Sequence, residues 1–288
     1  MPVLQTMAGL TGPAASDVLD DRWVMNYFAA VGDSDPRYFD NRGDTPLPAH
    51  AAYVSHLEWD AIGLLHEAHL EALTPAERVR GVHSFNSTRL HRPLRSGDAL
   101  SSTATVVGVE RRRAGAKITM RIDTVDDAGT AVATSYTATN FLGVDADGDV
   151  LPPEVRLSTA AAGAEPVRTE DIEIGPLAPY VFSECARDYG IIHTDLKVAT
   201  AAGFPGLILH GTGNIAYAVS SLTRHECGGD PTRVRGFQAR LTGMVLCPST
   251  MTVRVFDSTG DDAVHFDVLT DSGEVALADG ILLIGDPA

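Results

Sequence analysis

The sequence predicts an α+β protein made of two copies of one module, each with a long helix packed against an antiparallel sheet. An internal repeat is the first observation behind this prediction: residues 28–40 (FAAVGDSDPRYFD) are similar to residues 182–195 (FSECARDYGIIHTD), and residues 85–100 are similar to residues 237–251, in the same order. The second is that each half begins with helical segments and continues with runs rich in β-branched residues, separated by turns. Helices followed by a meander of strands are typical of α+β modules.

The C-terminal half shows this order of elements clearly. Asp195 is placed to cap a short helix over residues 196–202, which Gly203 ends. A long amphipathic helix is expected to begin at Gly211. Its apolar stripe, spaced i, i+3, i+4 and i+7, consists of Ile215, Ala218, Val219 and Leu222. The strands expected after it are residues 250–256, 264–269 and 275–284.

The N-terminal half repeats the pattern, with its helix expected over residues 48–65. Its expected strands are residues 101–109, 117–125 and 131–141. Between the halves the composition shifts to proline, alanine and acidic residues, which is typical of a linker. We therefore expect an N-terminal module over residues 1–150, a linker over residues 151–179 and a C-terminal module over residues 180–288.

Composition and simple motifs exclude several classes of function. A formal net charge of −16 argues against a nucleic-acid partner, because binding phosphates requires a basic surface. No apolar run is long enough to span a membrane and no signal-peptide pattern is present, so a cytoplasmic protein is expected. Three cysteines without CxxC spacing indicate neither a disulfide framework nor a zinc site. The sequence also lacks G-x-S-x-G, P-loop and HExxH motifs.

One short stretch carries residues suited to proton transfer. Asp188 and His193 lie five residues apart, and their side chains can meet if the backbone turns between them. Gly190 would permit such a turn by adopting a positive φ. Both groups would then be able to hold one water. Gly211, at the start of the expected long helix, would offer a backbone N–H and a partial positive charge to a carbonyl oxygen.

The same stretch resembles a known family. Residues 188–195 (DYGIIHTD), the Gly203-Phe204 pair and the His210-Gly211 pair are similar to the hydratase signature of MaoC-like enzymes, D-x-N-P-[IL]-H-x-D followed by GF or GY and then HG. The sequence departs from that signature at Gly190, where the family has Asn, and at Ile191, where it has Pro. The N-terminal half also resembles the first module of two-module proteins of this family, so the likeness covers the chain except for the linker.

The resemblance implies a double hotdog fold and a reversible hydratase of fatty acid metabolism. It implies that Asp188 and His193 share the proton transfers between a 2-enoyl and a 3-hydroxyacyl thioester, and that the amide of Gly211 binds the thioester oxygen. Tyr189, Gly190 and His210 are then candidates for contacts with the substrate. The acyl carrier would be coenzyme A or an acyl carrier protein, and neither a metal nor another cofactor is implied.

Other interpretations stay open at this point. Asp188 can also be read as a turn cap, His193 as a buried structural histidine, His210 as a residue that shapes the loop before the helix, and Asp195 as a helix cap. In the N-terminal half Tyr38 stands in the place of His193, and a phenol is a poor proton shuttle, so that half is expected to be catalytically degenerate. A hotdog thioesterase and a non-catalytic acyl-thioester-binding module are alternative functions, and the protein is expected to be a monomer or a homodimer.

Overall fold

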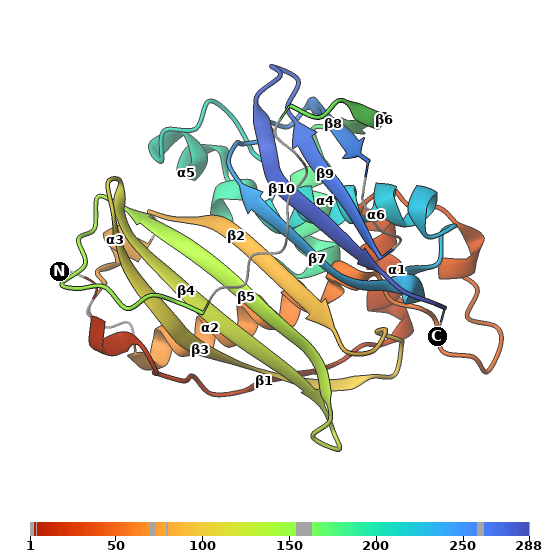
Figure 1. The fold of residues 1–288 in the computed structure, drawn as a ribbon, viewed down its shortest axis with the longest axis horizontal. Coiled ribbons are helices and arrows are strands. Elements are labelled where there is room, and N and C mark those ends of the chain that lie inside the picture. The colour runs from red at the N-terminus through yellow and green to blue at the C-terminus, as the bar shows by residue number, and fades with distance from the viewer. Residues whose placement is uncertain are drawn as a thin grey trace. The chain divides into compact units, whose positions relative to one another are not determined.

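The computed structural model describes residues 3, 5–69, 73–78, 80–153, 163–257 and 262–287 (Figure 1). The chain divides into two compact units, and both are assembled from segments that are distant in sequence. The first unit comprises residues 1–17, 57–91 and 99–157, and the second comprises residues 18–56, 92–98 and 158–288. This division differs from the expected modules, because the segment 18–56 folds with the C-terminal half.

The first unit consists of an antiparallel sheet and the helix α2. Its strands are β1 (Ala15–Val18), β2 (Gly81–Leu90), β3 (Ala99–Arg112), β4 (Gly115–Asp126) and β5 (Ala131–Leu142), in the spatial order β1-β3-β4-β5-β2. Helix α2 (Ser55–His69) supplies Ala61, Ile62 and Leu65 to a core that alternate residues of β3 and β4 complete. The unit also contains the 3-10 helix η1 (Gln5–Met7) and the short helix α3 (Pro75–Arg78).

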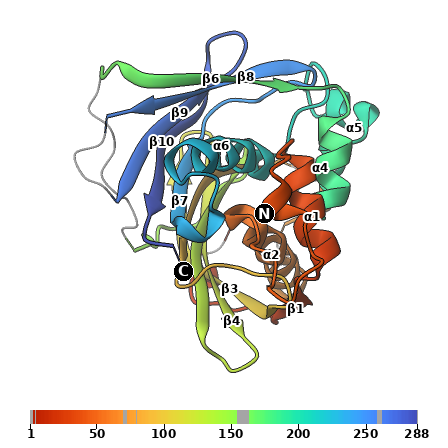
Figure 2. The ribbon, with the colours of Figure 1, turned by 90° about the vertical axis from the view of Figure 1, so that its right-hand side faces the viewer.

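The second unit has the same plan, with an antiparallel sheet and a longer buried helix. Its strands are β6 (Pro166–Ile174), β7 (Val234–Leu241), β8 (Ser249–Phe256), β9 (Ala263–Leu269) and β10 (Val275–Ile284), in the order β7-β10-β9-β8-β6. Helix α6 (Gly211–Glu226) is buried from Thr212 to Thr223. Figure 2 shows it within the curve of this sheet.

The second unit also contains smaller helices. They are α1 (Asp21–Ala30), η2 (Pro36–Tyr38), η3 (Ala51–Val54), α4 (Ala178–Ala186), η4 (Ile191–His193), α5 (Leu196–Ala201) and η5 (Pro231–Arg233). Asp20 caps α1 by accepting a hydrogen bond from the Trp23 amide, and α1 buries Val24, Tyr27 and Phe28. Helix α1 packs against α4, as Figure 2 also shows.

Most of the expected elements are confirmed. The long helix begins at Gly211, and Asp195 caps α5 by accepting a hydrogen bond from the Val198 amide. Strands β3, β4, β5, β8, β9 and β10 agree with the expected ranges to within a few residues. The expected helix over residues 48–65 is divided into η3 and α2.

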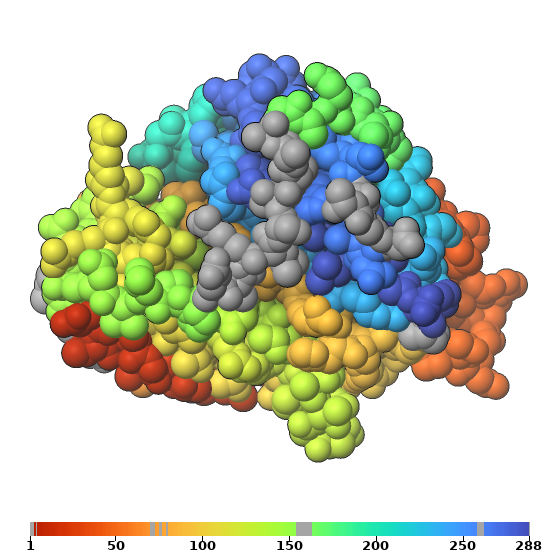
Figure 3. Space-filling model, viewed as in Figure 1, coloured from red at the N-terminus to blue at the C-terminus, as the bar shows by residue number. Residues whose placement is uncertain are grey.

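Strand β6 lies inside the range that was expected to be a linker. It is an edge strand that pairs with β8, and every second side chain from Val167 to Glu173 is exposed. Its green side chains lie at the rim of the blue sheet surface in Figure 3. An edge strand that is half exposed carries many charged residues, and these hid its strand character in the sequence. The stretch 154–162 lies outside the described residues.

Among the helices of the described residues, none combines the length and apolar character that a membrane span requires.

Candidate active site

The candidate carboxylate follows a sharp turn at the end of α4. The amides of Arg187 and Asp188 both donate to the carbonyl of Ser183, and Arg187 adopts the left-handed conformation with φ 54° and ψ 39°. This turn leads Asp188 to the first turn of α6. There the hydroxyl of Thr212 donates to Asp188 Oδ2 over 2.8 Å.

The candidate imidazole is held in one orientation. His193 ends the 3-10 helix η4, and its Nδ1 lies 2.9 Å from the carbonyl oxygen of Ile208. A carbonyl only accepts, so Nδ1 carries the proton and Nε2 keeps a lone pair in the neutral ring. Burial lowers the pKa of His193, which favours this neutral form.

Gly190 lies between the two candidate groups. A Cβ built at this position would lie 2.9 Å from His193 Cδ2, 3.4 Å from His193 Nε2 and 3.9 Å from Asp188 Oδ1. Nε2 and Oδ1 therefore both lie on the side of the Gly190 backbone toward which a Cβ would project. The expected positive φ at this glycine is wrong, because φ is −59° and the left-handed residue of the turn is Arg187. Glycine is needed here for the close approach of His193.

His210 connects the two candidate groups. It is 1% exposed, its ring stacks on that of His193, and its Nε2 lies 3.0 Å from the carbonyl oxygen of Asp188 and 3.0 Å from the hydroxyl of Ser183. Burial, together with the neighbouring His193, lowers the pKa of His210 to about 2. The ring is therefore neutral, and its contacts hold the Asp188 backbone and the His193 ring.

The first turn of α6 is open at its N-terminus. His210 is the N-cap residue but makes no side-chain capping bond, and the first helical hydrogen bond within this turn runs from the Asn214 amide to the His210 carbonyl. The leading N–H groups and the positive end of the helix dipole are thus next to Asp188. Gly211 stands at that end, as expected from the sequence.

The structure brings together five of the six candidate residues, namely Asp188, Gly190, His193, His210 and Gly211. Tyr189 is the exception, because its side chain is 64% exposed. Sequence reasoning missed Thr212, Ser183 and Arg187. Of these, Thr212 had a usable signal, since it directly follows the His210-Gly211 pair.

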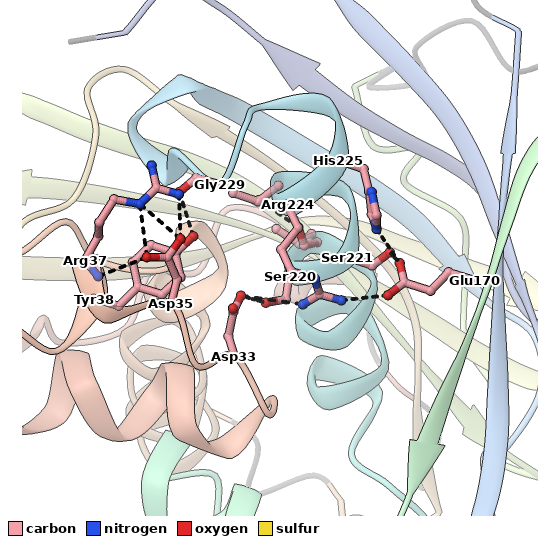
Figure 4. A network of polar contacts seen from close by, with 12 residues as sticks. Asp33, Asp35, Arg37, Tyr38, Glu170, Ser220, Ser221, Arg224, His225 and Gly229 are labelled. Carbon is pink, nitrogen blue, oxygen red and sulfur yellow. Dashed lines mark hydrogen bonds and ion pairs between the residues drawn. The ribbon is translucent and has the colours of Figure 1, made fainter.

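The repeated motif of the N-terminal half has other partners. Asp33 accepts a hydrogen bond from Ser220 of α6 and lies 3.6 Å from Nη1 of Arg224 (Figure 4). The hydroxyl of Tyr38 donates to the carbonyl of Gly229 over 2.7 Å, and its ring stacks on Phe28. Burial and the nearby Asp33 raise the pKa of Tyr38.

The same network continues to the edge strand β6. Arg224 Nη2 lies 2.9 Å from Glu170 Oε1, His225 Nε2 lies 3.2 Å from Glu170 Oε2, and Ser221 donates to Glu170 (Figure 4). Burial alone raises the pKa of Glu170, but the hydrogen bonds from Ser221 and Arg224 outweigh it and keep that pKa below its usual value. These contacts fasten α6 to the segment 18–56 and to β6.

A histidine also precedes the helix in the N-terminal half. His50 is the N-cap of η3, and its Nδ1 accepts a hydrogen bond from the Ala52 amide over 3.1 Å. Where the C-terminal half has His210 and Gly211, the N-terminal half has His50 and Ala51. His50 therefore caps the start of η3 with its side chain, whereas the start of α6 after His210 has no side-chain cap.

No three His, Cys, Asp or Glu side chains among the described residues are grouped so that they could hold a metal ion. A cavity of about 380 Å³ lies elsewhere in the second unit and includes none of the candidate residues. It is lined by residues of β8, β9 and β10 and by Gly163, Ala164, Glu165 and Pro166.

Comparisons with known protein families bear on two separate ranges of the chain. Residues 158–270 match the MaoC-like domain, and residues 9–135 match the dehydratase domain region of FAS1-like proteins. The chain contains a MaoC-like domain. This domain includes Asp188, His193 and Gly211 and confirms the family indicated by the sequence.

Known proteins are similar to this chain in sequence over parts of its length. The peroxisomal enoyl-CoA hydratase 2 of Arabidopsis thaliana is 36% identical over 64 residues, which are 22% of this chain and 21% of that protein. The chain spans between 4% and 33% of the length of the first four curated relatives that it matches.

The similarity in structure extends over nearly the whole chain. A MaoC-like dehydratase from Phytophthora capsici superimposes with a TM-score of 0.81 at 20% identity, over 99% of this chain and 98% of that one. Rv0216 of Mycobacterium tuberculosis, described as a double hotdog fold, superimposes with a TM-score of 0.62 at 16% identity, over 96% and 95%. The fold is therefore an α+β double hotdog, as the sequence predicted.

Proposed function

We propose that the MaoC-like domain of this chain is a hydro-lyase that adds water to a 2-enoyl thioester, or removes it from a 3-hydroxyacyl thioester. One observation carries the proposal: Asp188 Oδ1 and His193 Nε2 both lie within 4 Å of the position that a Cβ of Gly190 would occupy, and Asp188 is bonded to the open first turn of α6. A water held between these atoms has a carboxylate and a neutral imidazole within reach. The name of the Arabidopsis relative, enoyl-CoA hydratase 2, supports the same reaction.

The reaction needs two proton transfers and a site for negative charge. In hydration the water oxygen bonds to C3 while the C2–C3 π electrons move toward the carbonyl, and a proton then bonds to C2 as the carbonyl re-forms. Asp188 and His193 accept the proton from water and supply the proton to C2 between them. The lone pair on His193 Nε2 and the acceptor oxygens of Asp188 suit both directions.

The backbone N–H of Gly211, the first residue of α6, donates a hydrogen bond to the enolate oxygen in this proposal. Gly211 has no side chain to block the approach of the thioester, and the helix dipole favours the developing charge. Loss of one such donor typically lowers the rate by about 10² to 10³. His210 and Thr212 act on the same site by holding Asp188 and His193, while Gly190 and the exposed Tyr189 border the entry of the substrate.

The acyl carrier is coenzyme A or an acyl carrier protein, and the chemistry assigned here requires neither a metal nor a redox cofactor. The N-terminal half takes no part in the proton transfers, because Tyr38 and Asp33 are engaged in contacts with Gly229 and Ser220. Its motif serves to hold α6 instead. The protein acts as a monomer or a homodimer.

The direct test is the loss of enoyl absorbance with crotonyl-CoA and longer 2-enoyl-CoA thioesters. Asp188→Asn and His193→Gln are each expected to lower kcat by about 10² to 10⁴, the usual contribution of a positioned acid or base. Asp195→Asn is the matched control, since Asp195 belongs to the same motif but caps α5. Full activity of either Asp188→Asn or His193→Gln would contradict the proposal.

A thiol-trapping assay on the same substrates separates hydration from thioester hydrolysis. Release of free thiol, abolished by the same substitutions, would assign the site to a thioesterase. Saturable binding of acyl-CoA without turnover would assign it to a non-catalytic binding module.

A further inference from the structure

Arg187 adopts an unusual backbone conformation directly before the candidate carboxylate. Its φ of 54° places it in the left-handed region, where the Cβ of any residue but glycine crowds the backbone. Glycine is the usual residue at this position of a helix C-terminus. An arginine here needs other interactions to hold it, and its side chain provides them.

The side chain of Arg187 is held by two elements from the segment 18–56. Its Nη2 donates to the hydroxyl of Tyr53 in η3 over 2.8 Å, and its guanidinium carbon lies 4.7 Å from the ring centroid of Trp23 in α1. The second contact is a cation–π interaction, which Trp supports best. Tyr53 is fully buried, so its hydroxyl is a fixed anchor.

The elements that carry these anchors are themselves fixed against α4. Tyr27 of α1 lies with its ring centroid 5.9 Å from that of Phe182 in α4 and 5.4 Å from that of Tyr53. Its hydroxyl donates to the carbonyl of Ala52. Arg187 thus contacts Trp23 and Tyr53, and Tyr53 belongs with Tyr27 and Phe182 to an aromatic cluster that joins α1, η3 and α4.

The turn at Arg187 determines where Asp188 points. Asp188 follows this turn directly and is held at three points. Its carboxylate accepts a hydrogen bond from Thr212, its carbonyl oxygen lies 3.0 Å from His210 Nε2, and its amide donates to the carbonyl of Ser183. A small rotation at Arg187 would move the carboxylate away from the side of Gly190 on which His193 Nε2 also lies. A displacement of about 1 Å in a reacting group can cost about 10² in rate.

We infer that Arg187 is a positioning residue for Asp188, and that Trp23 and Tyr53 hold the side chain of Arg187 in place. The inference rests on the proposed hydratase function. It assigns a role in the reaction to the N-terminal segment, which supplies no proton-transfer group of its own. Its side chains hold the turn from which the carboxylate of the C-terminal motif projects.

The test uses Arg187→Gly, because glycine accepts the left-handed conformation and the substitution removes only the side-chain anchor. We expect kcat for 2-enoyl-CoA hydration to fall by about 10- to 100-fold, with KM changed by less than about twofold. Tyr53→Phe keeps the ring and removes the anchoring hydroxyl. It should also lower kcat, but by a smaller factor than Arg187→Gly does. Adding Tyr53→Phe to Arg187→Gly should have no further effect.

Asp279→Gly is the matched control, because Asp279 is the other described non-glycine residue with positive φ, at 52°, and lies in β10 outside the site. Its activity should equal that of the unmodified protein. Thermal unfolding of each variant shows whether the fold is retained. A variant that has unfolded is replaced by Arg187→Lys, which keeps the charge and loses the planar hydrogen-bonding fork.

A positioning role also predicts how Arg187 and Asp188 interact. In an Asp188→Asn background, Arg187→Gly should lower the residual kcat by less than about twofold, because the group that it positions is already disabled. An equal loss in both backgrounds, or wild-type activity of Arg187→Gly while Asp188→Asn is inactive, overturns the inference. Full activity of Asp188→Asn would instead overturn the proposed function.

Discussion

The imidazole ring of His193 stacks on that of His210, with 3.8 Å between the ring centroids and 26° between the planes. The two rings are anchored through different nitrogens, His193 by Nδ1 to the Ile208 carbonyl and His210 by Nε2 to the Asp188 carbonyl. Burial keeps His210 neutral, so the stack does not place a fixed positive charge against His193. His193 is therefore able to accept a proton during a reaction, although its burial makes the charged form less stable.

The pH dependence of activity should report the burial of His193. Burial lowers its pKa below the ordinary value of about 6.5, so His193 is expected to stay neutral well into the acid range. If its neutral form is required, kcat/KM for hydration should be constant from pH 8 to about 6.5 and should fall only at lower pH. The measurement is a pH profile of crotonyl-CoA hydration, with unfolding checked at each pH. An acid limb centred above pH 6.5 would contradict this assignment.

Gly190 is expected to be essential for activity rather than for stability. An alanine Cβ would lie 2.9 Å from His193 Cδ2, and the ring cannot shift without losing its bond to Ile208. The backbone itself accepts alanine, because φ is −59° and ψ is 108°. Gly190→Ala should therefore lower kcat by at least about tenfold while the urea midpoint changes little.

Gly206→Ala is the control for that experiment, since a Cβ at Gly206 would meet no atom within 4 Å. It should leave kcat and KM as they are. Equal activity of Gly190→Ala and Gly206→Ala would show that the space beside Gly190 is not part of the site.

Local sequence patterns were sufficient for most of the helices and strands. The apolar stripe after Gly211 and the position of Asp195 predicted α6 and the cap of α5, because both depend on neighbours within two turns of a helix. Each of these features follows from contacts within about 25 residues of the chain.

Features that depend on distant segments were not predictable in the same way. The packing of α1 and η3 onto the C-terminal half leaves no periodic signal, and so the anchors of Arg187 were not foreseen. The need for glycine at position 190 arises from the nearby His193 ring and not from a positive φ, and no local pattern in the sequence indicates this contact. The sequence of the polar edge strand β6 resembles a linker, because the strand forms only by pairing with β8, some 80 residues away.

Substitutions in the N-terminal motif should affect stability and leave the chemistry intact. Asp33→Ala removes the acceptor of Ser220 and leaves Arg224 without one of its partners. We expect a loss of about 1 to 3 kcal/mol in the free energy of unfolding, the usual cost of leaving a buried hydrogen-bonding group without its partner. Tyr38→Phe removes only the bond to Gly229 and should cost about 1 kcal/mol.

Urea unfolding and hydration kinetics at 25 °C test this expectation together. Both variants should keep kcat within about threefold, because neither residue contacts Asp188 or His193 through a hydrogen bond, while Asp188→Asn should lose activity without a comparable loss of stability. A loss of kcat in Tyr38→Phe comparable to that of His193→Gln would show that the N-terminal motif takes part in the reaction.

The buried carboxyl of Glu58 should make the stability of the protein fall as pH rises. Glu58 lies on α2, is 3% exposed, and accepts hydrogen bonds from Ser135 and, over 3.5 Å, from Asn86. Burial raises its pKa to about 7, despite these hydrogen bonds. The folded protein then retains a proton between pH 4.5 and 7 that the unfolded chain releases, so each pH unit in this window lowers the free energy of unfolding.

Glu58→Gln removes this titration and keeps the shape of the side chain. Relative to the unmodified protein, the variant should gain stability from about pH 4.5 upward and reach a constant advantage of up to about 3 kcal/mol above pH 7, at 1.36 kcal/mol per unit of pKa shift. Urea unfolding at four pH values between 4.5 and 8 measures the difference, with Glu67→Gln on the exposed face of α2 as the control. If the difference between Glu58→Gln and the unmodified protein is the same at every pH, Glu58 does not carry the raised pKa.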